Sequence, residues 1–403
     1  MHKYLLERDE GHVFSYLLDE NTRALEIRSD PLEAEDSPGD IFKARIMNIA
    51  SGINAAFVRY KEGVNGYLPL DAAENAFYFH KSTASGPRAG DELLVQVKKI
   101  PEGEKLVSLT ADISIAGDFT VADASVKRSG VSSKISGDRS RRLKELAGQL
   151  ADEDFGIVIR TAAEEASDDD ITKEAVRLKK KLKELLDRAS YASCPSCLYK
   201  QPPMWLMRLN RPDITAADEI LTDDKELFGY LNEWAVDGNK KAKLRFYENR
   251  MQSMHDCYRL GRELSRALDK KIWLDSGAFL VIEPTEALTV IDVNSGKATS
   301  RIKNKESEEV FLKLNMEAAK EAAAQLRLRN ICGMIIIDFI NMREEASRVQ
   351  LQHFLQKELD KDPVRSKAVD FTKLNLMEIT RQRKELPLGA VYPERTGEKD
   401  HEL

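Results

Sequence analysis

The spacing of apolar residues changes along the chain, from short alternating runs near its start to longer helix-like and strand-like runs towards its end. Residues 14–28 contain two half-apolar runs on either side of the turn-prone residues 19–21, which predicts a β-hairpin. Residues 29–40 are polar and rich in proline and glycine. Such a composition is typical of a linker, so we expect a domain boundary there.

Residues 39–117 contain short apolar runs separated by turn residues. Short strands at this spacing are typical of small β-barrels, because each strand must turn back before it can pair. The pattern predicts one barrel of five strands, over residues 41–49, 53–60, 65–70, 91–99 and 105–112.

Helical spacing dominates the middle of the chain. Helices are predicted over residues 138–150 and 173–189, and most of residues 201–269 have a helical pattern. The helix over residues 173–189 is amphipathic and rich in lysine. A solvated face is the simplest interpretation of these lysines, and contact with RNA is the alternative.

Two apolar runs, residues 288–293 and 333–340, flank an alanine-rich segment with helical spacing. This order predicts a βαβ unit with two parallel strands that are covered on both faces and end at one edge of the sheet. Asp292 and Asp338 come late in these strands. Strand spacing alone would then place their carboxylates about 5 to 10 Å apart.

Two carboxylates at the ends of buried strands are costly unless a cation or another partner compensates their charge. Hard oxygen ligands of this kind suit Mg²⁺, which takes one or two carboxylates and completes its shell with water and phosphate. The alternative is that one aspartate caps the following turn and the other pairs with Arg327, Arg329 or Lys297. The pattern by itself leaves both interpretations open.

The composition narrows the class of protein. A chain of 403 residues is too long for one core and predicts several domains, and 42% apolar with 32% charged residues is typical of globular rather than disordered chains. The net charge of −6 excludes a histone-like binder, so a nucleic-acid site must be a local patch. Because we find no signal peptide, no apolar run long enough to span a membrane and only four cysteines, we expect a cytoplasmic protein.

Several strings in the chain, in this order, resemble the ribonuclease E/G family. They are GDIFKARIMNIASGINAAFVRY, NGYLPL, IVIRTA, LTVIDVNSGKAT, LNMEAAKEAAAQLRLRNICGMIIIDFINM and LMEITRQR. The resemblance runs from the first strand to about Arg383 and is weakest over residues 117–154 and 191–269.

The resemblance implies a Mg²⁺-dependent endoribonuclease that cleaves single-stranded, AU-rich RNA with a metal-activated water, in RNA processing and decay. The expected products carry 5′-phosphate and 3′-hydroxyl ends. Asp292 and Asp338 match the two metal ligands of the family, and Asn294 matches the asparagine that positions the catalytic site. Lewis-acid stabilisation of a pentacoordinate phosphate requires such an arrangement.

The resemblance also implies a multidomain α/β architecture. It consists of an RNase H-like fold with an inserted OB-type β-barrel and a 5′-sensor subdomain, followed by a DNase I-like α/β catalytic subdomain. The expected boundaries are 1–37 with 203–270 for the RNase H-like domain, 38–117 for the barrel, 118–202 for the sensor, 271–390 for the catalytic subdomain and 391–403 for a tail.

The matching strings also imply which residues of this chain contact RNA. Phe57 and Tyr67 match the aromatic residues that stack on bases, and Lys105 matches a lysine that contacts RNA. Stacking beside a cationic groove is the usual chemistry of single-strand binding. Lys297 is a candidate for holding phosphate. The alternatives are a core position for Phe57 and an ordinary surface position for Lys297.

A 5′-monophosphate site is implied by the string IVIRTA, in which Arg160 and Thr161 match the residues that grip the phosphate. Arginine binds phosphate through a forked pair of donors, and the threonine hydroxyl adds another donor. Gly130 and Val131 match the backbone of this pocket approximately, but the loop before them differs from the family pattern. Sensing of the 5′ end is therefore altered or absent in one interpretation.

Some residues depart from the family pattern. Asn341 stands in DFINM where the family has a carboxylate, which would weaken metal affinity. The segment after residue 383 lacks the Cys-Pro-x-Cys zinc link of longer members, so a zinc-linked dimer is doubtful and the oligomeric state stays open. Cys194 and Cys197 have ligand spacing, but their position argues against zinc and favours small core cysteines.

A second class of function is compatible with these departures. A single-stranded RNA-binding protein that has lost cleavage would keep the barrel and tolerate Asn341. A Mg²⁺ enzyme that acts on nucleotides instead of RNA is a third interpretation. It would leave Phe57, Tyr67 and Lys105 without a role, so it ranks last.

Overall fold

The computed structural model describes residues 2–74, 76–82, 86–101, 105–125, 129–237, 243–296, 308–383 and 385–391. Two compact units divide the chain. One is Glu33–Pro203, and the other combines Met1–Leu32 with Met204–Leu403. Among the helices in the described ranges, none is both long and apolar enough to cross a membrane.

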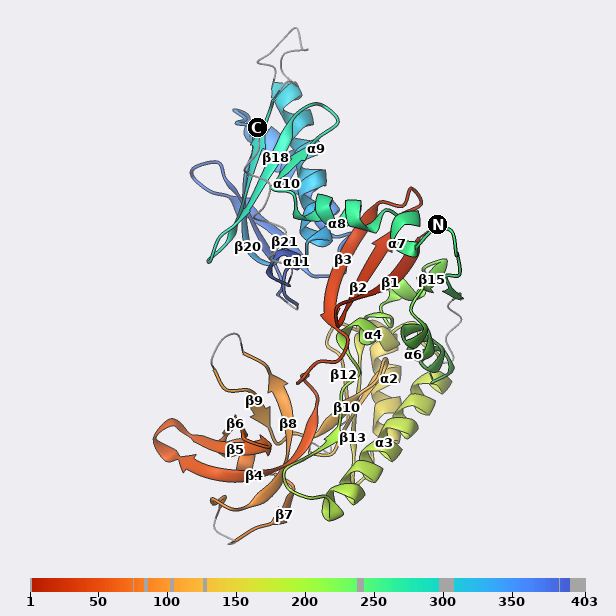
Figure 1. Ribbon diagram of the computed structural model, residues 1–403. Helices are drawn as coiled ribbons and strands as arrows, with labels where there is room; N and C mark the ends of the chain where they lie inside the picture. The colour runs from red at the N-terminus through yellow and green to blue at the C-terminus, as the bar shows by residue number, and fades with distance from the viewer. Residues whose placement is uncertain are drawn as a thin grey trace. The chain divides into compact units, whose positions relative to one another are not determined.

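A closed β-barrel lies in the unit Glu33–Pro203 (Figure 1). Its sheet closes because β4 pairs with β5 on one side and with β8 on the other. The predicted five-stranded barrel is thereby confirmed. Its strands are β4 (Ile41–Ala50), β5 (Ala55–Lys61), β6 (Val64–Pro69), β8 (Glu92–Lys99) and β9 (Ser108–Thr110), with β7 (Tyr78–His80), β14 (Ser196–Tyr199), α1 (Leu70–Glu74) and the 3-10 turn η1 (Ser51–Ile53) attached.

The same unit holds a four-stranded sheet with two helices. Glu174 on the longer helix is buried, and its carboxylate accepts hydrogen bonds from the backbone N–H groups of Asp118, Phe119 and Thr120, all at 2.8 Å. These bonds tie the helix to the sheet. The elements are β10 (Ser114–Ala116), β11 (Thr120–Asp123), β13 (Gly156–Ile159), β12 (Gly130–Val131), α2 (Gly137–Leu150), the 3-10 turn η2 (Thr161–Ala163) and α3 (Asp168–Tyr191).

The other unit contains a five-stranded sheet whose strands come from the segments before and after Glu33–Pro203. The predicted hairpin over residues 14–28 is confirmed as β2 (His12–Leu18) and β3 (Ala24–Pro31), and a further strand, β1 (Lys3–Asp9), precedes it. Two strands from far along the chain, β15 (Glu219–Thr222) and β16 (Leu244–Phe246), complete the sheet in the order β16-β15-β1-β2-β3.

The segment predicted to be largely helical, residues 201–269, is therefore mixed. It contains two short strands that pair in parallel, β15 with β1 and β16 with β15. Hydrophobic periodicity within the segment cannot reveal the pairing with β1, which lies outside it. The rest follows the prediction, with helices α4 (Met204–Arg208), α5 (Pro212–Thr215), α6 (Lys225–Asp237), α7 (Met254–Cys257) and α8 (Leu260–Leu268).

A six-stranded mixed sheet follows in the same unit. The predicted βαβ unit is confirmed, because β19 (Thr289–Asn294) and β20 (Gly333–Asp338) are parallel neighbours joined through α9 (Glu308–Leu328). The sheet order is β17-β18-β19-β20-β22-β21. The remaining elements are β17 (Lys271–Trp273), β18 (Phe279–Pro284), β21 (Ser366–Phe371), β22 (Met377–Arg381), α10 (Glu345–Leu359) and α11 (Leu388–Val391).

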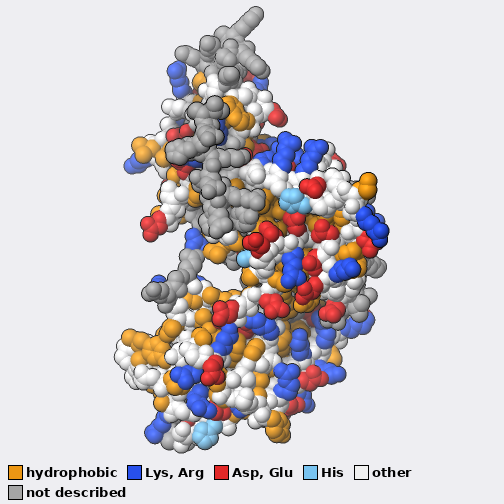
Figure 2. Space-filling view, viewed as in Figure 1, with side chains coloured by type: hydrophobic (Ala, Val, Ile, Leu, Met, Phe, Trp, Pro, Cys, Tyr) orange, Lys and Arg blue, Asp and Glu red, His pale blue; other side chains and the backbone are white. Residues whose placement is uncertain are grey.

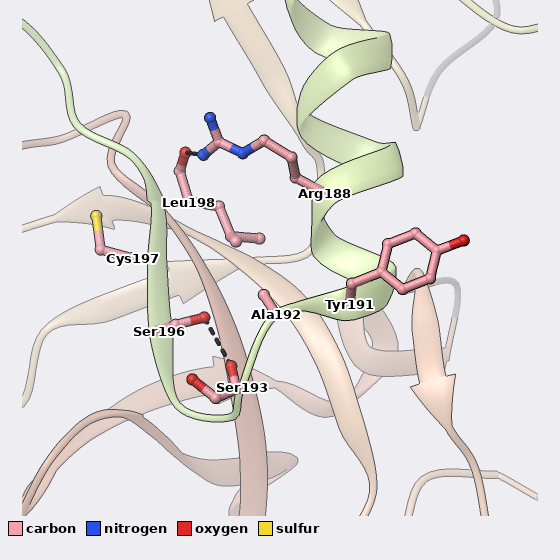
Figure 3. Close-up of a pocket in the computed structure, with 7 residues that line it drawn as sticks. All are labelled: Arg188, Tyr191, Ala192, Ser193, Ser196, Cys197 and Leu198. Atoms are coloured by element: carbon pink, nitrogen blue, oxygen red, sulfur yellow. Dashed lines mark hydrogen bonds between the residues drawn. The ribbon is translucent and has the colours of Figure 1, made fainter.

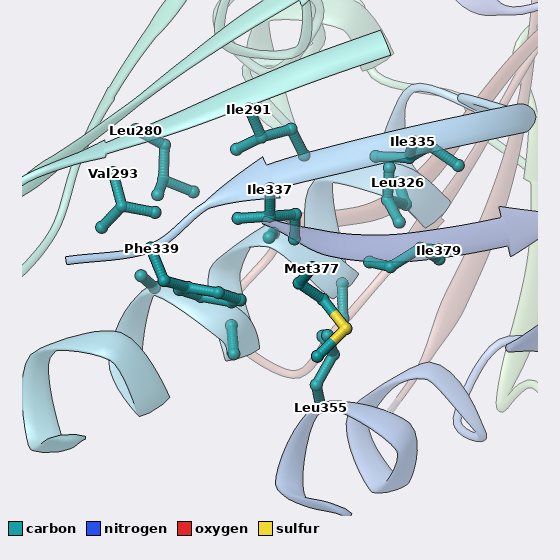
Figure 4. Close-up of a cluster of buried hydrophobic side chains, with 14 of the residues drawn as sticks. Leu280, Ile291, Val293, Leu326, Ile335, Ile337, Phe339, Leu355, Met377 and Ile379 are labelled. Atoms are coloured by element: carbon teal, nitrogen blue, oxygen red, sulfur yellow. The ribbon is translucent and has the colours of Figure 1, made fainter. Parts of the chain in front are cut away.

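The expectation that these strands are covered on both faces is wrong. One face packs against α9 and α10, and Figure 4 shows its side chains, among them Ile291 and Ile337, in that core. On the opposite face Val290 and Ile336 are half-buried, and Met334 is 55% exposed. No helix within the described ranges covers this face. A mixed sheet tolerates one wet face, whereas an all-parallel sheet does not.

Charged side chains are buried where β3 contacts α9 and the segment that contains α4 and α5. Arg211 donates to the Glu26 carboxylate at 2.6 and 3.0 Å, and Arg208 forks onto Asp30 at 2.7 and 3.0 Å. Burial tends to raise the pKa of Glu26, but Arg28 and Arg211 outweigh it and lower this pKa to about 2. Glu26 is therefore ionised at neutral pH, which satisfies the arginines around it.

Asn315 joins α9 to the chain that leaves β20. Its side chain is fully buried, donates to the Ile340 carbonyl oxygen at 2.7 Å and accepts from the Ile340 N–H at 3.0 Å. Both backbone groups of Ile340 are thus satisfied by one amide. The loop that begins after Asp338 is held by this pair of hydrogen bonds.

We predict that Asn315→Ala lowers the free energy of unfolding by about 2 to 4 kcal/mol, because it leaves two partly buried backbone groups without partners. Thermal or chemical unfolding measures the effect. Lys313→Ala is the matched control on the same helix, since Lys313 is exposed and pairs only with Glu309 among the described ion pairs. Equal stability of the two variants would contradict the role given to Asn315.

Candidate functional site

Asp292 and Asp338 lie directly opposite each other. The parallel register pairs them at the ends of β19 and β20, so one strand spacing, about 4.8 Å, separates their backbones. Both side chains are exposed. Asn294, two residues further along the same face of β19, donates from Nδ2 to the Asp292 Oδ2 atom at 2.6 Å. The predicted catalytic trio is therefore brought together at one edge.

The loop after β20 is anchored beside this pair. Glu308, the first residue of α9, accepts hydrogen bonds from the N–H groups of Arg343 and Glu344 at 3.1 and 3.0 Å. These two bonds lower the pKa of the Glu308 carboxyl. Asn341 lies in this loop, exposed, and accepts a long hydrogen bond of 3.5 Å from Asn375. The residue that departs from the family pattern is thus close in sequence to Asp338 and open to solvent.

Both aspartates are exposed, so their charges do not carry the cost of burial that the sequence pattern predicted. Their mutual repulsion remains, since two carboxylates one strand apart gain from a shared cation. The alternative ion pairs are also absent from the described structure: Arg327 pairs with Glu26 and Asp213, and Arg329 donates to a glutamine one turn before it. Lys297 lies outside the described residues.

The donor set fits a small divalent ion. Two carboxylates with open access are what Mg²⁺ uses when water and a phosphate supply its other ligands. Among the described residues, no group of three or more His, Cys, Asp or Glu side chains is placed so that it could hold a metal ion. Zinc, which takes three or four protein ligands, is therefore a poorer match to this edge.

On the barrel, the register pairs Phe57 of β5 with Tyr67 of β6. Both rings are half-buried, whereas Ala56 and Val58 beside Phe57 are fully buried, so Phe57 faces outwards and the core alternative is wrong. Lys105 is exposed and lies just before β9, whose Ser108 pairs with Tyr67. The two aromatic residues are therefore neighbours on adjacent strands, and Lys105 is three residues from the strand position that pairs with Tyr67.

The barrel also carries exposed apolar side chains. Figure 2 shows hydrophobic side chains gathered over the barrel strands. Exposed apolar residues in one place often mark a binding surface. Those of the barrel are Met47, Ile53, Val64, Ile100 and Leu106.

The residues predicted to hold a 5′-phosphate meet at one edge of the four-stranded sheet. β12 and β13 are parallel, with Gly130 opposite Val158 and Val131 opposite Ile159. Just after these pairs, the hydroxyl groups of Ser132 and Thr161 form a hydrogen bond of 2.8 Å. Arg160 is exposed and donates to the Gly117 carbonyl oxygen. A part of the loop before Gly130, residues 126–128, lies outside the described residues.

A cavity of about 430 Å³ lies at the end of α3, and Cys197 is among the residues that line it (Figure 3). Cys197 lines this cavity and is exposed, and Cys194 is half-buried, so the prediction of small core cysteines is wrong. Partial burial raises the pKa of both thiols.

Sequence reasoning did not identify Asn315 and Glu308, which hold the loop beside Asp338. A signal was present for Asn315, because it is a polar residue beside Leu314 and Ala318 on the apolar stripe of the predicted helix. A buried asparagine there needs hydrogen-bond partners from another element. Glu308 carried no comparable signal.

Comparison with known proteins matches residues 114–384 to the model of the Ribonuclease E/G family. The chain is 34% identical over 359 residues to Ribonuclease G of Haemophilus influenzae and 31% identical over 358 residues to Ribonuclease G of Escherichia coli K12, covering 86% of this chain and 72% of each relative. It is 32% identical over 359 residues to Ribonuclease E of Nostoc sp., covering 51% of that protein. The matched segment contains both aspartates and Asn294, and the chain belongs to the ribonuclease E/G family.

Proposed function

We propose that this chain is a cytoplasmic, Mg²⁺-dependent endoribonuclease that cleaves single-stranded, AU-rich RNA in RNA processing and decay, leaving 5′-phosphate and 3′-hydroxyl ends. One observation carries the proposal. Asp292 and Asp338 are exposed and in register at the carboxyl ends of two parallel strands, within the segment that matches the family. The carboxyl edge of parallel strands is a common place for ligands.

The side chains at this edge have distinct tasks in the proposal. Asp292 and Asp338 would hold Mg²⁺, which would supply positive charge for the phosphate and make water a better nucleophile. Asn294 fixes the orientation of the Asp292 carboxylate through its 2.6 Å hydrogen bond. Orientation matters because a misplaced ligand weakens both metal binding and alignment.

The barrel supplies affinity in this proposal. Phe57 and Tyr67 would stack on bases, and Lys105 would attract the backbone, with Lys297 as a further phosphate contact. The paired, outward-facing rings support stacking, which tolerates any base because every base has a π-face. Sequence-tolerant binding suits an enzyme that acts on many RNAs.

We also propose the family's subdomain assignment. The RNase H-like domain would comprise residues 1–37 and 203–270, the OB-type barrel 38–117, the 5′-sensor 118–202, the DNase I-like subdomain 271–390 and the tail 391–403. A single sheet built from strands before residue 32 and after residue 218 supports the first assignment. The six-stranded sheet, which begins at Lys271, supports the catalytic one.

The second candidate is a single-stranded RNA-binding protein without cleavage. Asn341 is the observation in its favour, because an amide in place of a carboxylate removes one negative charge three residues after Asp338. The two candidates differ in one assay. A labelled single-stranded oligonucleotide incubated with Mg²⁺ would be shortened by an enzyme and held intact by a binder.

We predict that Asp292→Asn and Asp338→Asn each slow cleavage at least about a hundredfold, since loss of a metal ligand costs several kcal/mol in the transition state and each 1.4 kcal/mol is tenfold in rate. EDTA should abolish wild-type cleavage. Oligonucleotide binding should change little. Asp370→Asn, at an exposed aspartate on β21 of the same sheet, is the control and should retain activity. Near-normal, Mg²⁺-dependent cleavage by Asp292→Asn would refute the assignment.

We predict that Phe57→Ala weakens binding of a single-stranded oligonucleotide by about 1 to 3 kcal/mol, the usual value of one stacked base. Fluorescence anisotropy in the absence of Mg²⁺ measures binding without cleavage. Tyr191→Ala removes an exposed aromatic ring outside the barrel and serves as the control. Unchanged affinity in a well-folded Phe57→Ala variant would exclude stacking by this ring.

We predict that RNA with a 5′-monophosphate is cleaved faster than RNA with a 5′-hydroxyl or 5′-triphosphate end. The expected ratio is about 10- to 150-fold, because a hydrogen bond to a charged group contributes about 1.5 to 3 kcal/mol. Arg160→Gln or Thr161→Val should reduce the preference without slowing cleavage of the 5′-hydroxyl RNA. Equal wild-type rates on all three ends would show that the sensor is absent.

A further inference from the structure

An aromatic pair lies on the face of the six-stranded sheet that α9 and α10 leave open. Trp273 is 60% exposed, and its ring centroid is 5.0 Å from that of Phe279, at an angle of 56°. The Lys271 Nζ atom lies 4.2 Å from the Trp273 centroid and 3.8 Å from the Phe279 centroid. Two rings and a cation are therefore clustered at the end of this sheet.

Strand register places this cluster beside the carboxylates. Phe279 pairs with Asn294 on β19, and Trp273 pairs with Phe279. The next row across the sheet runs from Lys271 through Val281 to the Asp292–Asp338 pair. All of these residues share a face, because the residues between them along each strand, Ile272, Leu280 and Val293, are buried on the other side.

The spacing suits a substrate that extends from the carboxylates. Neighbouring strands are about 4.8 Å apart, so the Phe279 position is one strand from Asn294 and the Trp273 position is two. A phosphate held at Asp292 and Asp338 would therefore bring an adjacent base over this aromatic pair. Stacking of a base on an aromatic ring beside a cation is the usual chemistry of single-strand binding.

A role in the core does not account for Trp273. A core tryptophan hides its ring, as Trp205 does at 0% exposure, whereas Trp273 leaves most of its surface open. A protein partner on this face would have to bury Asp292, Asp338 and Lys271 together with the rings, which is costly without matched charges. A single strand of RNA keeps its phosphates hydrated and brings its own flat apolar surfaces.

We propose that Trp273 and Phe279, with Lys271, bind a base of single-stranded RNA next to the phosphate that is cleaved. The inference rests on the proposed function, because it takes the Asp292–Asp338 edge as the place of cleavage. It adds a stacking site on the catalytic sheet itself, separate from the aromatic residues of the barrel. Lys271 supports the rings and carries a positive charge that attracts the adjoining phosphate.

The first test measures kcat/KM for a fluorescent single-stranded oligonucleotide with the full chain. Trp273→Ala should lower kcat/KM about tenfold, and Trp273→Phe should restore most of it. Met334→Ala is the matched control, because Met334 is an exposed apolar residue on the same sheet face at the other end of β20. An abasic nucleotide beside the cut should slow the wild-type protein and leave Trp273→Ala unaffected.

The second test does not depend on cleavage. With Mg²⁺ present and the signal recorded on mixing, before product accumulates, the oligonucleotide should quench tryptophan fluorescence of the wild-type protein, and Trp273→Phe should remove most of this quenching. Normal kcat/KM of Trp273→Ala without any quenching difference would overturn the stacking site and leave the proposed function intact. Quenching through Trp273 without cleavage would instead refute the proposed function and leave only a base-binding face on this sheet. A change of mass on light scattering in Trp273→Ala would identify the face as an interface between copies and overturn the inference.

Discussion

The parallel pairing of β19 with β20 is the constraint on which the candidate active site depends. A crossover through α9 makes the two strands parallel, so both end at the same edge, and the register sets Asp292 opposite Asp338. A slip of one residue would turn one aspartate into the core, because side chains alternate between the faces. Small residues on α9, Ala318 and Ala322, allow the helix to pack closely on the covered face. The chemistry at the edge is therefore secured by packing on the opposite side.

The proposed binding and cleavage sites depend on the same property of β-sheets. On the barrel, alternation buries Ala56 and Val58 and turns Phe57 outwards beside Tyr67. On the six-stranded sheet, it buries Ile291 and Val293 and turns Asp292 outwards. In each case the apolar half of a strand stabilises the fold while the other half presents functional groups. Substitutions at the outward positions can consequently alter function with little effect on stability.

Two incorrect expectations have a common origin. Near-continuous apolar runs over residues 288–293 and 333–340 suggested strands covered on both faces, but Val290 and Ile336 are only half-buried. The helical pattern of residues 201–269 concealed β15 and β16. β15 pairs with the N-terminal strand β1, and β16 pairs with β15. Hydrophobic pattern reports which residues can be buried, whereas the actual covering layer depends on segments that are distant in the sequence.

The sequence by itself determined the five barrel strands, the βαβ unit and the late position of both aspartates, because periodicity and turn residues are local properties of the chain. Its motifs also indicated the family. Only the tertiary structure decided that β4 closes the barrel on β8, that Asp292 stands opposite Asp338 and that Asn315 holds the neighbouring loop. It also placed Trp273 on the face of the carboxylates. These features depend on pairing between distant segments, and the free energy of such pairing comes from packing and hydrogen bonds that no local pattern encodes.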